Sequence, residues 1–226
     1  MDQQTKFLCG LIELQYDPEI APELRLSAEK ISWAKGWPEK DDSFWNAEAF
    51  MWENKINKST REIIFLELKK QLAGLDGRNL DLGCGAYSYV PSVGVDFSAK
   101  MLQFNENCQE KINADLEKEL PLKEESFDSA TMVFSLNYIQ NYQLLLSEIR
   151  RALKSGGKLV IVLSANEING WQRQKEKNRF SKPELTKILE QKGFLVNAYK
   201  RDNLLFFVCI KKIVCIKKKE EKKLKT

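Results

Sequence analysis

The feature that most constrains the fold is a regular alternation of strand-like and helix-like segments between residues 59 and 210. Seven short runs rich in apolar residues have the length and composition of strands, namely 79–82, 93–97, 112–114, 129–135, 158–164, 194–200 and 204–210. Helical periodicity separates several of them. This alternation predicts an α/β fold with a mostly parallel sheet, to which the last two runs add an antiparallel hairpin at the edge.

Capping signals mark where the helices should begin and end. Ser59 precedes Glu62 by three residues, and Ser181 precedes Glu184 by three, which is the pattern of a capping box at a helix start. The adjacent glycines at 156–157 are predicted to close a helix that begins near residue 145.

Three regions differ in composition. Residues 1–56 hold four of the five tryptophans, and Trp45, Ala49 and Trp52 share one face of a predicted helix. That spacing favours a core stripe over a ligand-facing role, and the region is expected to be a helical extension able to act as a lid. Residues 57–212 are the predicted α/β domain, and 213–226 are a predicted basic, disordered tail.

Charge and residue usage exclude several classes of function. The net charge is +4, but residues 211–226 contribute +6, so the remainder carries −2 and lacks the charge expected of a nucleic-acid-binding domain. Only the lysine-rich tail offers that charge. The chain has no histidine, which excludes imidazole bases and Ser-His or Cys-His triads.

The cysteines and the apolar runs bear on location. Five scattered cysteines fit neither a disulfide framework nor metal-ligand spacing, so we expect reduced thiols, no metal site and a cytoplasmic protein. Residues 204–210 are only seven apolar positions, well below the ~20 that span a bilayer, so no membrane association is expected.

Polar residues and glycines follow four predicted strands. The first strand runs into 81–85 (DLGCG), the second ends at Asp96, the third is followed by Asp115, and the fourth ends at 134–136. In a doubly wound sheet these carboxyl ends form one ligand-binding edge. A glycine loop beside one carboxylate, with two more acidic strand ends, suits an extended adenosine that bears a cation.

These segments resemble the class I S-adenosylmethionine-dependent methyltransferases, and in particular the type 11 group. The resemblance covers residues 80–210 and rests on motifs in the family's order: 81–85 (DLGCG), 93–98 (VGVDFS), 114–116 (ADL), 120–122 (LPL), 126–128 (SFD) and 148–157 (EIRRALKSGG). It implies a Rossmann-like doubly wound seven-stranded sheet and S-adenosyl-L-methionine as cofactor.

The resemblance also implies roles for individual residues. Gly83 and Gly85 would line the methionine portion, Asp81 would hold its amino group, Asp96 the ribose, Asp115 the adenine, Phe97 and Leu116 would sandwich the base, and the Phe134 carbonyl would face the methionine end. Only seven residues separate Gly85 from the next strand, and Pro91 is among them, so the family's helix there should be short or replaced by a turn.

The acceptor side is less defined. Tyr138 is a candidate catalytic contact to the acceptor, with a packed aromatic as the equal alternative. Residues 169–174 combine a tryptophan with donors and a cation and could form a lid with the N-terminal region. The sequence predicts a methyltransferase with a small-molecule acceptor. A non-catalytic binding module and an RNA or protein methyltransferase remain as alternatives, whereas a nicotinamide dehydrogenase would need a glycine at Ser88.

Overall fold

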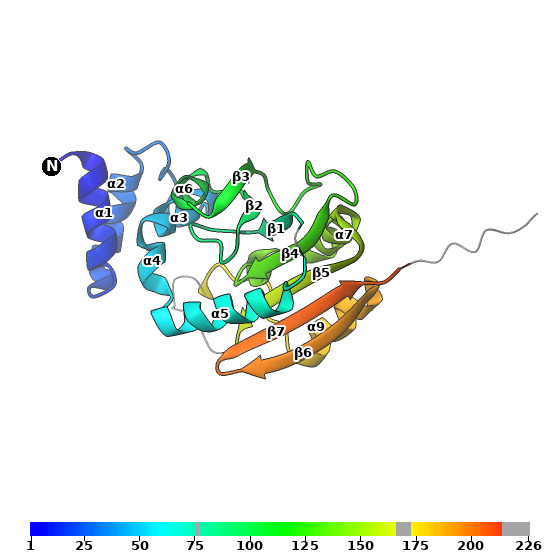
Figure 1. Cartoon of the computed structure of the whole chain (residues 1–226). Helices are drawn as coiled ribbons and strands as arrows, with labels where there is room; N and C mark the ends of the chain where they lie inside the picture. Colours follow the sequence, from blue (N-terminus) through cyan, green and yellow to red (C-terminus); the bar gives the residue numbers. More distant parts are fainter. Residues whose placement is uncertain (76, 166–172, 214–226) are drawn as a thin grey trace, which may run out of the picture.

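The computed structural model describes residues 1–75, 77–165 and 173–213. At its centre is a seven-stranded sheet in the order β3-β2-β1-β4-β5-β7-β6 (Figure 1). The strands are β1 (Asn79–Leu82), β2 (Ser92–Asp96), β3 (Cys108–Asn113), β4 (Phe127–Val133), β5 (Leu153–Ser164), β6 (Phe194–Arg201) and β7 (Leu204–Lys211). β1 to β5 pair in parallel, and β7 pairs antiparallel with both β5 and β6. The predicted fold class is confirmed.

The order of the strands reverses between β1 and β4. From β1 the chain proceeds outward to β2 and β3, then returns to place β4 on the other side of β1. Crossovers that leave in opposite directions open a crevice at the carboxyl ends of these two strands, where doubly wound folds bind ligands.

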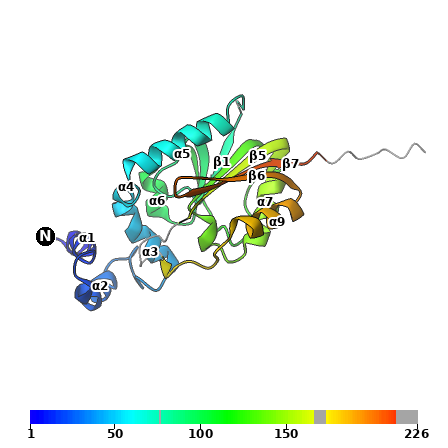
Figure 2. The same cartoon turned by 90° about the horizontal axis from the view of Figure 1, so that it is seen from below.

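Helices cover both faces of the sheet (Figure 2). α5 (Lys58–Gln71) lies on one face, and α7 (Tyr142–Ala152) and α9 (Lys182–Gln191) lie on the other. Side chains of β5 pack against the helices on both faces, because side chains alternate along a strand. Val160 packs with α5, whereas Leu159 and Ile161 pack with α7 and α9.

Two predictions about helix ends were wrong. The N-cap of α5 is Asn57, two residues before the predicted cap Ser59. Asn57 has extended backbone and its side chain accepts the Thr60 N–H at 2.8 Å, which leaves Ser59 inside the helix. Glycines 156 and 157 do not end α7; they lie within β5. Gly156 has a φ of +75°, and the pairing of β5 with β4 shifts register there, so the glycines permit an irregularity in the strand. The capping box at Ser181 is confirmed.

Residues 1–55 form a helical region with its own apolar cluster. It contains α1 (Gln3–Glu13), α2 (Ala21–Ala28), α3 (Asp41–Glu48) and α4 (Trp52–Lys55), with 3-10 turns at Pro18–Ile20 and Ala49–Met51. The cluster joins the body through Met101 of α6 (Ala99–Phe104). In Figure 1, α1 and α2 project to the left, whereas α3 and α4 lie against the body. The 3-10 turn at Ala49–Met51 interrupts the single helix predicted through Trp45 and Trp52.

Part of the predicted lid and most of the predicted tail fall at residues 166–172 and 214–226, outside the described residues. None of the helices in the described ranges has the length and hydropathy of a bilayer-spanning segment.

Candidate functional site

A cavity of about 240 Å³ lies at the carboxyl ends of β1, β2 and β4, between the sheet and the helices α3 and α4. Eight of the nine residues predicted for the site line it: Gly83, Gly85, Asp96, Phe97, Asp115, Leu116, Phe134 and Tyr138. Asp81 does not, because its side chain lies behind the glycine loop. The cavity coincides with the point where the strand order reverses.

The glycine loop approaches its neighbours too closely for a side chain. Gly83 and Gly85 have φ values of +63° and +57°, in the left-handed region that favours glycine. A Cβ atom on Gly83 would meet the Ser135 Cβ at 2.5 Å, and one on Gly85 would meet the Trp52 ring at 3.4 Å. The loop is therefore a cradle of bare backbone, which fits the close approach of a nucleoside-type cofactor.

A turn replaces the helix that usually follows this loop, and two asparagines hold it. The Asn105 side chain donates to the Gly85 carbonyl at 3.0 Å and to the Ser88 hydroxyl at 3.0 Å. Asn107 donates to the Ser88 carbonyl at 2.7 Å. The short spacing predicts the turn, but nothing in the sequence identifies these two residues as its support, because they lie beyond β2.

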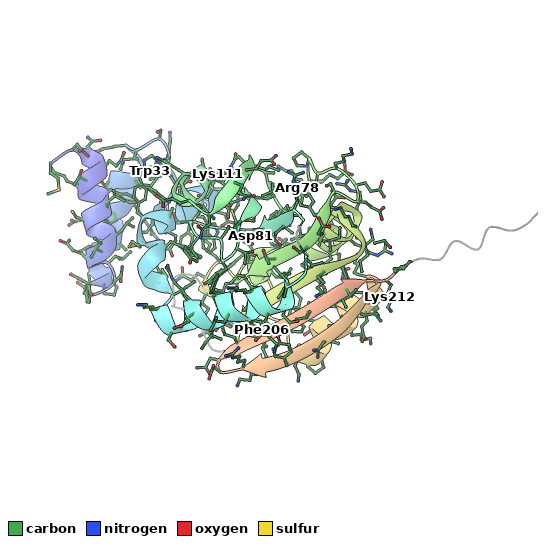
Figure 3. All side chains as sticks on the ribbon, viewed as in Figure 1. Trp33, Arg78, Asp81, Lys111, Phe206 and Lys212 are labelled. Atoms are coloured by element: carbon green, nitrogen blue, oxygen red, sulfur yellow. The ribbon has the colours of Figure 1, made fainter. Side chains whose placement is uncertain are left out.

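Asp81 is buried at the centre of the protein, where Figure 3 labels it. Its carboxylate accepts the Ser88 hydroxyl at 2.6 Å and the Thr131 hydroxyl at 2.8 Å. Burial raises the pKa of Asp81 to about 6, against the opposing effect of these two donors. Asp81 thus ties β1 to β4 and to the turn, and it faces a second, smaller cavity on the other side of the loop.

Asp96 stands at the end of β2 on the wall of the larger cavity. One carboxylate oxygen accepts the Gly85 N–H at 3.0 Å and the other accepts the Ser98 N–H at 2.9 Å. Burial raises its pKa to about 6. Ser98, not Asp96, caps α6, since the Ser98 hydroxyl accepts the Met101 N–H at 3.1 Å. Each Asp96 oxygen keeps a lone pair for a further donor.

The segment after β3 contributes a polar and an apolar surface. Asp115 lines the cavity and accepts the Glu117 N–H at 3.0 Å, while Leu116 is buried at its wall. No sequence pattern pointed to Glu117. Its two oxygens accept the backbone N–H groups of Gln140 at 2.6 Å and Asn141 at 2.7 Å, which fixes the loop that leads into α7.

The end of β4 carries backbone strain. Phe134 has a φ of +56°, a conformation that costs a non-glycine residue about 1–2 kcal/mol. It is held there by its N–H, which donates to the Val162 carbonyl at 2.9 Å, and by the Ser135 hydroxyl, which donates to the Leu82 carbonyl at 2.8 Å. These two hydrogen bonds hold the strained backbone at the wall of the larger cavity.

Aromatic rings form the opposite wall. Tyr138, at the end of the 3-10 turn Leu136–Tyr138, meets the Trp45 ring edge-on at 4.8 Å, and Trp45 meets Trp52 at 6.3 Å. The predicted core stripe is thus also part of the cavity wall. Burial raises the pKa of Tyr138, so its phenol stays protonated near neutral pH and is a poor general base.

An ion pair closes the rim of the cavity. Lys175 donates to Asp41 Oδ1 and to the Glu39 carbonyl, both at 2.8 Å, and its ammonium lies 5.2 Å from the centre of the Phe44 ring. These contacts attach the segment that begins at residue 173 to the start of α3. Within the described part of the chain no three potential ligands gather as a metal site, and Cys9, Cys84, Cys108 and Cys209 are unpaired.

Comparison with known proteins agrees with the fold. Residues 80–161 match the model of the methyltransferase domain family. An uncharacterized protein of Methanocaldococcus jannaschii is 28% identical over 132 residues, and a demethylmenaquinone methyltransferase of Tropheryma whipplei is 35% identical over 94 residues. These alignments cover 52% and 36% of this chain but only 64% and 39% of those relatives. Among solved structures, the DhpI–SAH complex superposes with a TM-score of 0.61 at 17% identity, over 76% of this chain and 96% of that one.

The fold is that of a doubly wound α/β protein, and its larger cavity lies at the switch point of the sheet. The stretch from residue 80 to residue 161 is similar to the methyltransferase domain family, and the chain shares the fold of the DhpI–SAH complex.

Proposed function

We propose that this protein transfers a methyl group from S-adenosylmethionine to a small-molecule acceptor. The observation that carries the proposal is that the glycine loop, the acidic strand ends and the aromatic wall all line the same cavity. One wall suits an adenosine, and the other suits an apolar or aromatic acceptor whose approach to the cofactor excludes water.

The strand-end wall divides into sites for the parts of the cofactor. Asp96 would accept both ribose hydroxyls with its free lone pairs, and Asp115 would accept the adenine amino group. Phe97 and Leu116 would hold the base between them. Gly83, Gly85 and the strained carbonyl of Phe134 would face the methionine portion, with Asp81 behind the loop attracting its ammonium group.

The bound cofactor would supply an electrophilic methyl group, so the chain's task is alignment and exclusion of water. Trp45, Trp52 and Tyr138 would desolvate the acceptor beside the cofactor. Tyr138 would act as a neutral hydrogen-bonding group, because its pKa is raised by burial. With no histidine in the chain, the proposed acceptor is one whose reacting atom needs no imidazole base.

Two observations favour a small acceptor over a nucleic acid. The net charge outside residues 211–226 is −2, which gives little attraction for phosphate backbones. A relative with 35% identity over 94 residues is named a demethylmenaquinone methyltransferase, and its named acceptor is not a nucleic acid.

The first test is calorimetry with S-adenosylmethionine and S-adenosylhomocysteine, where micromolar binding, about −8 kcal/mol, is expected. The second is transfer of a tritiated methyl group into fractionated cell extract, with label expected in the small-molecule fraction. Label in RNA or protein would overturn the acceptor class. Binding without transfer to any fraction would indicate a non-catalytic module.

A further inference from the structure

Two thiols meet beside the glycine loop, above a glycine of the neighbouring strand. Cys84 is the middle residue of the loop, and Cys108 is the first residue of β3. A Cβ atom on Gly94 of β2 would meet the Cys108 sulfur at 2.2 Å and the Cys84 sulfur at 2.9 Å. Both cysteines are buried free thiols. The missing side chain of Gly94 therefore leaves the space in which the two sulfurs lie.

The two cysteines differ in how readily they ionise. A hydrogen bond from the Cys84 thiol lowers the pKa of Cys108 to about 7, against the opposing effect of burial. The same hydrogen bond, together with burial, raises the pKa of Cys84 well above its usual range. Peroxides oxidise a thiolate and not a thiol, and Cys108 lies on the edge strand of the sheet. Cys108 is therefore the reactive member of the pair, with a protonated second thiol beside it.

The thiol pair is connected to the groups that position the glycine loop. The Ser88 hydroxyl lies 3.3 Å from the Cys108 sulfur and donates to Asp81 at 2.6 Å. Cys84 lies between the two glycines that line the larger cavity with bare backbone. A covalent bond brings two sulfurs closer together than unbonded thiols can approach. Such a bond would draw Cys84 toward β3 and displace the loop with it.

We propose that Cys84 and Cys108 form a reversible disulfide on exposure to hydrogen peroxide, and that this bond weakens cofactor binding. The Cys108 thiolate attacks one peroxide oxygen: an S–O bond forms, the O–O bond breaks, and the leaving hydroxide takes up a proton to become water. The Cys84 sulfur then attacks the sulfenic acid, so that an S–S bond forms and the S–O bond breaks with release of a second water. Two thiols are oxidised and one peroxide is reduced. The effect on the cofactor rests on the proposed function, whereas formation of the disulfide does not.

The first measurement maps the disulfide in the full chain. A background with Cys9→Ser and Cys215→Ser leaves only the three buried cysteines. After treatment with hydrogen peroxide and digestion by trypsin without reductant, the peptide 79–100 should be joined to the peptide 101–111, since each holds one thiol of the pair. The joined peptides should lack the mass of two hydrogen atoms, and dithiothreitol should separate them.

The second measurement is calorimetry with S-adenosylmethionine on the reduced and the oxidised background protein. Oxidation should lower the affinity about ten- to a hundredfold, the worth of one lost hydrogen bond to a charged group, such as that from the Gly85 N–H to Asp96. Cys108→Ala should bind like the reduced background protein and should not respond to peroxide. The matched control is Cys209→Ala, which removes a buried thiol from β7 and should leave the response intact.

Three results would overturn the inference: no joined peptide, a joined peptide without loss of affinity, or an equal loss of affinity in Cys108→Ala. If that variant did not fold, the background protein would decide, because dithiothreitol should restore its affinity as it separates the peptides. Failure of the reduced protein to bind the cofactor would instead refute the proposed function, and the peptide map would still show whether the disulfide forms.

Discussion

The two walls of the larger cavity are built by different means. On the strand-end wall, Gly83 and Phe134 have left-handed backbone, and Asp96 is fixed by two backbone N–H groups. On the opposite wall, Trp45, Trp52 and Tyr138 are positioned by ring packing. Backbone geometry tolerates little change, whereas packed rings adjust to one another. Single substitutions should therefore change stability and cofactor affinity much more on the strand-end wall than on the aromatic wall.

The largest effect is expected at the glycine loop. Gly83→Ala should lower the free energy of unfolding by roughly 2–5 kcal/mol, from left-handed strain of about 1–2 and overpacking against Ser135 of about 1–3. Gly74→Ala is the matched control, since Gly74 has a φ of +78° but no atom near its missing side chain, so only the strain applies. Urea unfolding measures both. Equal losses would show that the contact with Ser135 is unimportant.

Asp96→Ala should weaken cofactor binding by about ten- to a hundredfold, because it removes acceptors for the ribose hydroxyls. It should also lower stability by about 1–3 kcal/mol, since the Gly85 and Ser98 N–H groups lose their partner. Asp128→Ala is the control. The Asp128 carboxylate also accepts a backbone N–H, from Arg78 at 3.0 Å, but Asp128 lies at the start of β4, whereas the cavity lies at the carboxyl end of that strand. Loss of affinity in both variants would argue against a direct role for Asp96.

Raising the pH should increase the affinity for the cofactor and decrease the stability that the Asp96 carboxyl contributes. The pKa of Asp96 is raised to about 6, and a ligand that donates to its carboxylate favours the ionised form. Affinity should therefore be about tenfold lower at pH 5 than at pH 8. Because the folded pKa lies above the unfolded value of 3.8, the carboxyl's contribution to stability is present below pH 3.8 and is lost as pH rises through 6.

Asp81, whose pKa is also about 6, should add to both trends. Calorimetry and denaturant unfolding across pH 4.5–8 test them. In Asp96→Asn the change in affinity should shrink, and an undiminished change would assign it to another group.

The smallest effect is expected on the aromatic wall. Trp52→Leu should weaken cofactor binding by only about two- to tenfold, the range of a lost aromatic contact. Trp33→Leu is the control, because Trp33 stacks on Phe50 at 5.1 Å in the same cluster but does not line the cavity. A loss for Trp52→Leu as large as that for Asp96→Ala would mean that the two walls do not differ as proposed.

The sheet and the order of its strands can be predicted from the amino-acid sequence. Alternating strand and helix patterns predict an α/β sheet with a C-terminal hairpin, because side-chain periodicity is a local property of the chain. The order of 81–85, Asp96, Asp115 and Phe134 predicts one edge, since the ends of parallel strands meet there. Local patterns gave the wrong helix ends where two interpretations fitted equally well. Asn57 and Ser59 are both suitable N-cap residues, and a pair of glycines suits either a helix end or an irregularity in a strand.

The side of the glycine loop on which each carboxylate lies depends on packing between distant segments. Asp81 and Asp96 both end strands, yet the packing of Ser88 and Thr131 draws Asp81 behind the loop while Asp96 faces the larger cavity. The meeting of Cys84 and Cys108 above Gly94 is equally invisible in the sequence. Thr131 lies fifty positions from Asp81 in the sequence, and no local pattern records which distant residues a fold brings into contact.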